Sequence, residues 1–142
     1  IGAGHSVTAL YQIVPADSQE QASTPEVDPL RYQTGRTLSG RADSSEMLTL
    51  KLRYKQPEGS TSKLVTGTLE DRGEGVKHAS DNFRHAAAVA AFGMLLRDSK
   101  HKGRAGWDLV AGLAEGARGA DPHGYRREFS DLVDKASSLA GR

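Results

Sequence analysis

The chain contains no cysteine among its 142 residues. Structural disulfides, thiolate catalysis and zinc sites built from cysteine are therefore excluded. An excess of one charge is also lacking, because 19 lysines and arginines are balanced by 18 aspartates and glutamates. A dedicated nucleic-acid binder usually carries a strong basic excess, so we expect no nucleic-acid partner.

Long apolar runs are missing as well. None approaches the roughly 18–20 residues needed to cross a bilayer, and the N-terminus has no signal-peptide pattern. We therefore expect no membrane contact by this segment. The first residues, Ile1-Gly2-Ala3-Gly4, lack a methionine and are typical of the approach to a strand. We expect the chain to be a fragment of a longer protein.

The first half of the chain has the pattern of β-structure. Residues 6–14 are rich in β-branched and aromatic types, and residues 47–55 alternate between apolar and polar side chains. A turn leads from this second segment into residues 63–69, which we expect to be the other arm of a hairpin. Residues 16–46 are polar and too many for an ordinary connection, so we expect a mobile loop there, with a ligand-facing excursion as the alternative.

The second half changes to a helical period near 3.6. A first helix near residues 81–98 leaves almost no polar face, which predicts that it is buried on nearly every side. Helices near residues 107–118 and 122–140 carry apolar stripes suited to flank it. Asp121 and Pro122 are expected to begin the third helix, as its N-cap and its first residue.

These patterns predict an α+β fold. An antiparallel, sandwich-like β half of about three strands occupies residues 1–76, and a three-helix unit occupies residues 77–142. Three strands with one apolar face are marginally stable unless something covers them. We therefore expect upstream strands to complete the sheet, and an exposed sheet edge in the isolated fragment to form a homodimer.

No local motif assigns a reaction. Gly2-Ala3-Gly4 fails the dinucleotide fingerprint because Val7 stands at the third glycine position. Residues 43–47 depart from D-x-S-x-S, a motif that holds a divalent cation, because Met47 replaces the last serine. We predict no catalytic, cofactor or metal site. A hydrolase that uses histidines and carboxylates is the less favoured alternative. The five histidines are scattered and form no i, i+4 pair. They are His5, His78, His85, His101 and His123.

Basic residues provide the candidate interaction surface. Three lie in the loop after the first helix and two in the first turns of the third: Lys100, Lys102, Arg104, Arg126 and Arg127. The favoured interpretation of the loop is a solvated segment that complements the carboxyl end of the first helix. The alternative is binding of an anionic polymer or nucleic acid. Arginine is unfavourable at a helix N-terminus, so we expect Arg126 or Arg127 to meet a carboxylate such as Asp98, Asp121 or Glu128.

Several blocks of the sequence resemble a known family. They are residues 1–13 (IGAGHSVTALYQI), 47–55 (MLTLKLRYK), 83–99 (FRHAAAVAAFGMLLRDS) and 121–129 (DPHGYRREF). Together, in this order, they resemble the C-terminal region of bacterial von Willebrand factor type A domain proteins. That region follows the A domain.

The resemblance implies a supporting role. The metal-ion-dependent adhesion site of such proteins belongs to the A domain, so no metal ligand is carried over to this chain. The implied partners are the upstream A domain and a further protein. The implied location is the cell envelope or another extracytoplasmic site, because these proteins are often anchored through their N-termini. We therefore expect a non-catalytic accessory module whose β half extends a sandwich-like region.

Overall fold

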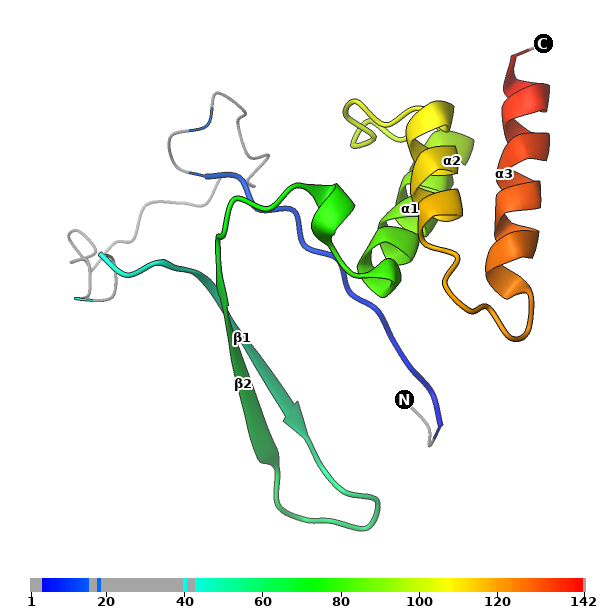
Figure 1. Cartoon of the computed structure of the whole chain (residues 1–142). Helices are drawn as coiled ribbons and strands as arrows, with labels where there is room; N and C mark the ends of the chain where they lie inside the picture. The colour runs from blue at the N-terminus through cyan, green and yellow to red at the C-terminus, as the bar shows by residue number, and fades with distance from the viewer. Residues whose placement is uncertain (1–3, 16–17, 19–39, 41–42, 142) are drawn as a thin grey trace. The chain divides into compact units, whose positions relative to one another are not determined.

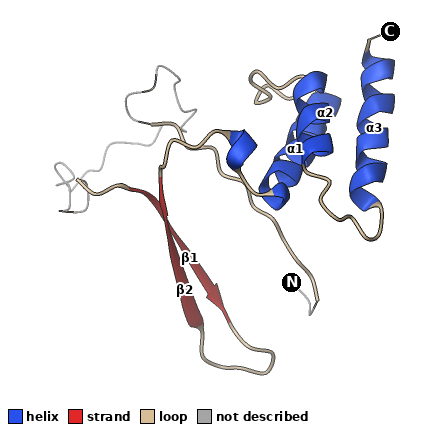
Figure 2. Ribbon diagram, viewed as in Figure 1, coloured by secondary structure: helices blue, strands red, loops and turns tan. Residues whose placement is uncertain are grey.

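A computed structural model describes residues 4–15, 18, 40 and 43–141 (Figure 1). The fold is α+β, with an antiparallel hairpin of two strands followed by three α-helices (Figure 2). The chain divides into two compact units, one formed by Val14–Glu74 and the other by Ile1–Ile13 together with Gly75–Arg142. The predicted fold class is confirmed.

A β-hairpin lies in the first unit. Strand β1 (Glu46–Tyr54) pairs with strand β2 (Lys63–Glu70), and Leu48, Leu50 and Leu52 face Leu69, Gly67 and Val65. The connecting turn is closed by the N–H of Gly59, which donates to the carbonyl of Gln56 at 2.8 Å. Alternation of apolar and polar residues predicted this hairpin, and the register confirms it.

The predicted first strand is wrong. Residues 6–14 are extended but have no strand partner among the described residues, so the sheet has two strands there and not three. The segment up to Ile13 belongs to the helical unit. Composition shows that a segment suits a strand, but the ladder also needs a partner, which the local pattern cannot supply. Most of the predicted loop at residues 16–46 lies outside the described residues.

Three helices make up most of the second unit. A short 3₁₀ turn η1 (Val76–His78) leads into α1 (Asp81–Leu96), which is followed by α2 (Trp107–Gly116) and α3 (Tyr125–Ala140). The hydroxyl of Ser80 caps α1 by accepting the N–H of Phe83 at 3.2 Å. Among the described residues, no helix is long and apolar enough to span a membrane.

The third helix begins later than predicted. Gly124, with φ of 73°, is its N-cap, and Pro122 lies in the preceding turn. Asp121 still caps the helix, but from outside it, by accepting the backbone N–H groups of Arg126 at 3.2 Å and Arg127 at 2.9 Å. The left-handed conformation at Gly124 makes this geometry possible, since glycine adopts a positive φ without steric cost.

Aromatic rings join the three helices in a small core. Phe92 of α1 meets Trp107 of α2 and Phe129 of α3 edge-on, with ring centroids 6.0 and 5.4 Å apart. Val110 and Val133 are fully buried in the same cluster. The helical unit is thus held together around one side of α1.

The prediction that α1 is buried on nearly every side is wrong. Only Ala88, Ala91 and Phe92 are buried, whereas Phe83, Val89 and Leu96 are 49%, 45% and 60% exposed. The reason is the number of neighbours. Both α1 and α3 pack mainly against α2, which has only 10 residues and cannot enclose the 16 residues of α1.

Candidate interaction surfaces

The hairpin presents one continuous apolar face. Residues that oppose each other in an antiparallel ladder project to the same side, so Leu48, Leu50, Leu52 and Tyr54 share a face with Val65 and Leu69. Leu50, Leu52 and Val65 are 51%, 60% and 52% exposed. No described element of the same unit packs on this face, and contiguous exposed apolar patches usually mark interaction sites.

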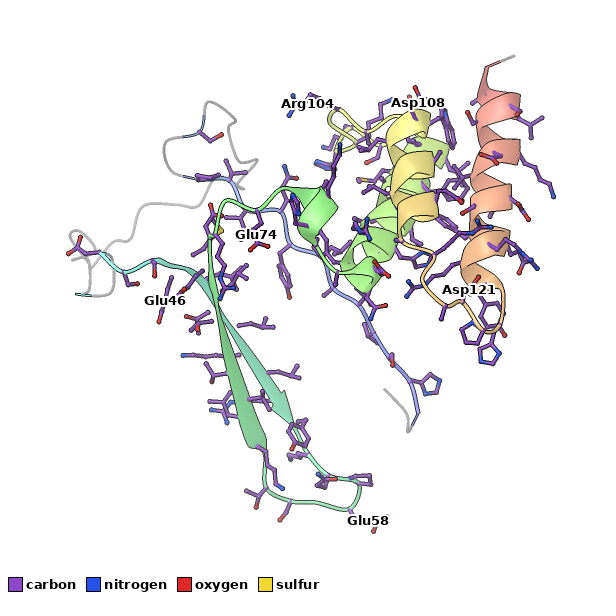
Figure 3. The ribbon with its side chains drawn as sticks, in the orientation of Figure 1. Glu46, Glu58, Glu74, Arg104, Asp108 and Asp121 are labelled. Atoms are coloured by element: carbon purple, nitrogen blue, oxygen red, sulfur yellow. The ribbon has the colours of Figure 1, made fainter. Side chains whose placement is uncertain are left out.

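The opposite face of the hairpin is mainly polar and basic. Thr49 opposes Thr68, Lys51 opposes Thr66, and Arg53 opposes the one leucine of this face, Leu64. Arg53 extends the face toward the turn and donates from Nη1 to the hydroxyl of Ser62 at 3.4 Å. The two faces therefore differ in chemistry. The polar face can be solvated, whereas the apolar face is stabilised when a layer of protein covers it. Figure 3 shows side chains along both strands between Glu46 at one end and Glu58 at the turn.

The basic loop after α1 contains three of the five predicted surface residues: Lys100, Lys102 and Arg104. Lys102 forms an ion pair with Asp98, four residues before it. This hydrogen bond and the adjacent positive charge lower the pKa of Asp98 below its ordinary value of 3.8. The local pair neutralises part of the charge that the loop would offer to an anion.

The other two predicted residues begin α3. Arg126 donates from Nη1 to the carbonyl of Ala117 at 2.6 Å and from Nη2 to Oδ1 of Asn82 at 2.5 Å. Its side chain thus ties together three parts of the helical unit. Of the three predicted carboxylates, Asp121 meets this pair, but it accepts their backbone N–H groups. The Arg127 hydrogen bond is the main reason that the pKa of Asp121 lies below its ordinary value of 3.8.

The structure separates these five residues into two groups. Arg126 contacts Asn82 in the first turn of α1, whereas the basic loop follows the last turn of the same helix. Since α1 has 16 residues, the two ends lie about 24 Å apart. Figure 3 likewise places Arg104 and Asp121 at opposite ends of the helices. A combined basic surface is not assembled, and binding by either group stays a prediction.

A groove runs between the N-terminal segment and the exposed side of α1. It has a volume of about 510 Å³, with Leu10 on one wall and Ala86, Val89 and Ala90 on the other. His85 lies at its polar end, where its ring meets Phe129 edge-on at 5.3 Å. This groove was not predicted from the sequence. The signal that could have indicated it is the surplus of apolar residues on α1, which we interpreted as complete burial.

His85 is the histidine with the most distinctive surroundings. Burial lowers its pKa below 6.5, and the positive charge of Arg126 lowers it further, while Asp121 acts in the opposite direction. The imidazole is therefore neutral near pH 7. His123, another residue of the hydrolase alternative, stacks at a tilt against Tyr125. In the part of the chain that the structure describes, no three histidine, aspartate or glutamate residues gather as a metal site would require.

Comparison with known proteins identifies a family. Residues 1–139 match the family described as "Uncharacterized protein YfbK, C-terminal". The chain is 35% identical over 139 residues to "Uncharacterized protein YfbK" from Escherichia coli (strain K12). That alignment covers 98% of this chain but 23% of the relative, so the chain spans about a quarter of the curated protein it matches. No solved structure matches the chain.

Proposed function

Because the chain belongs to the YfbK C-terminal family, we propose that it is a non-catalytic accessory module that packs against the rest of a longer protein. One observation carries this proposal, namely the uncovered apolar face of the hairpin. A two-stranded hairpin is at best marginally stable in water, and it needs further strands or a covering layer. Leu50, Leu52 and Val65 provide the surface for such a layer.

The neighbour that we propose is a von Willebrand factor type A domain. Support comes from the resemblance of residues 1–13, 83–99 and 121–129 to the region that follows such a domain. A metal-ion site and a cell-envelope anchor would then belong to upstream parts of the protein. Reading the gene upstream of Ile1 tests this proposal. An apolar strand followed by D-x-S-x-S supports it, and an upstream region without that motif rules out the A domain.

Replacing Leu52 with lysine on the apolar face is expected to weaken binding to the upstream polypeptide by about 10- to 100-fold. Full burial of a leucine contributes roughly 1.5–3 kcal/mol, and about 1.4 kcal/mol corresponds to a tenfold change in affinity. The two pieces would be expressed separately, and their dissociation constant would be measured by calorimetry.

Thr49→Lys is the matched control, because it adds the same side chain to the same strand on the polar face. It is expected to leave the affinity nearly unchanged. Equal losses from both substitutions would show that added charge, and not the apolar face, controls binding. An absence of binding by the unaltered chain would refute the proposal directly.

A further inference from the structure

The edge of β2 that does not pair with β1 is complementary in charge to the same edge of a second copy. Within the described residues β2 has one partner, β1, so its other edge lacks a neighbouring strand. Lys63 stands at the start of β2, whereas Glu70 and Asp71 stand at its end. A strand that is positive at one end and negative at the other matches a second copy of itself when the two run antiparallel.

We propose that two copies of this chain associate through their β2 edges, with a twofold axis at Gly67, to form a continuous four-stranded sheet. Around this axis Val65 faces Leu69 of the second copy on the apolar side, and Thr66 faces Thr68 on the polar side. Lys63 faces Asp71 across the new ladder. Opposed residues in an antiparallel ladder share a face, and the register in the hairpin places Val65 and Leu69 on the same side.

Gly67, at the proposed axis, has no side chain. A Cβ built there would have no atom within 4 Å, so no described atom lies close above the apolar face at this position. The least favourable pair in this register is Leu64 opposite Glu70. The carboxylate of Asp71 accepts the N–H of Gly73 at 2.8 Å through Oδ1, which holds the acidic end of the strand in a turn.

The outer edge of β1 is a poorer candidate. Its polar face carries Lys51 and Arg53, which have the same sign, so a symmetric pairing of β1 centred on Leu52 would bring like charges together. The ladder is also irregular between Glu46 and Leu48, and such irregularities discourage edge pairing. Charge and regularity therefore both favour the β2 edge and a second copy as its occupant.

Charge exchange tests the proposed register. The unaltered chain is expected to show a concentration-dependent monomer–dimer equilibrium by light scattering and sedimentation. Lys63→Asp and Asp71→Lys should each weaken the dimer by about tenfold, because each places two like-charged pairs across the new ladder. The double variant restores opposite charges and should recover most of the lost affinity. Thr49→Lys on β1 is the control and should not change the equilibrium.

Three results would overturn the proposal. One is a chain that stays monomeric at every concentration up to about 1 mM, because the affinity of the dimer would then be too low for the proposed edge pairing. Another is a dimer whose affinity falls in both single variants and does not recover in the double variant. The third is displacement of the dimer by the upstream polypeptide of the proposed function, since the β2 edge would then belong to that interface. The accessory role rests on the apolar face and survives any of these results.

Discussion

Replacing Phe92 with alanine is expected to destabilise the helical unit by about 3–5 kcal/mol, the usual loss for removing a buried phenylalanine. Its ring is 8% exposed and lies between Trp107 and Phe129. Small domains are stable by only about 5–15 kcal/mol in total. The variant should therefore lose much of its cooperative unfolding transition. Unfolding in urea, monitored by the near-ultraviolet signal of Trp107, would measure this loss.

Phe83→Ala is the matched control for this prediction. It removes the same side chain from the same helix, but Phe83 is 49% exposed. We expect a loss of less than about 1 kcal/mol, in keeping with substitutions near the surface. Similar losses at the two positions would contradict the finding that α1 has one buried side and one open side.

Replacing Ala88 with leucine is also expected to destabilise the helical unit substantially. Ala88 is fully buried, and α1 packs mainly against α2, which contributes the equally buried Ala114. Leucine adds three carbon atoms at a fully buried position, and overpacking of this kind costs about 1–3 kcal/mol. Thermal unfolding followed by circular dichroism would measure the loss.

Ala90→Leu serves as the control for this overpacking. Ala90 lies two residues further along the same helix and borders the groove beside Leu10. The added carbons can enter that groove, so the unfolding temperature should change little. A larger loss at Ala90 than at Ala88 would mean that the N-terminal segment, and not α2, packs tightly on α1.

Local pattern was sufficient to predict the hairpin and the three helices. Leu48, Leu50 and Leu52 alternate with polar residues, and this alternation survives in the structure because both strands lie next to each other in sequence. Ser80, a residue type that favours the N-cap, directly precedes α1, and its hydroxyl accepts the N–H of Phe83. Such features depend on neighbours within a few residues, which a sequence displays directly.

Features that depend on distant partners could not be predicted. Residues 6–14 have the composition of a strand, but whether a ladder forms depends on which segment lies beside them. Pro122 suits the first position of a helix, yet the positive φ of Gly124 moves the start to Tyr125. The apolar residues of α1 indicate a need for cover, but not how much of it this chain supplies.

The candidate surfaces also include one feature that the local sequence predicts and one that it does not. The apolar face of the hairpin follows from its alternation, whereas the grouping of charged residues does not follow from their spacing. Arg126 and Lys102 were predicted to share a surface. The structure instead commits Arg126 to Ala117 and Asn82, and it pairs Lys102 with Asp98. The Lys102–Asp98 pair spans only four residues of sequence, whereas the contacts of Arg126 with Ala117 and Asn82 depend on the tertiary arrangement.

The most direct test of the accessory role is amide hydrogen exchange in Glu46–Tyr54 and Lys63–Glu70. The chain alone, diluted below the concentration at which it dimerises, would be compared with the longer protein that contains it. An uncovered hairpin opens readily, and opening free energy sets the exchange rate. We predict that these amides exchange at least about 100-fold more slowly in the longer protein, an added protection of about 2.7 kcal/mol. Equal exchange rates in the two proteins would show that nothing covers the hairpin and would contradict the proposed function.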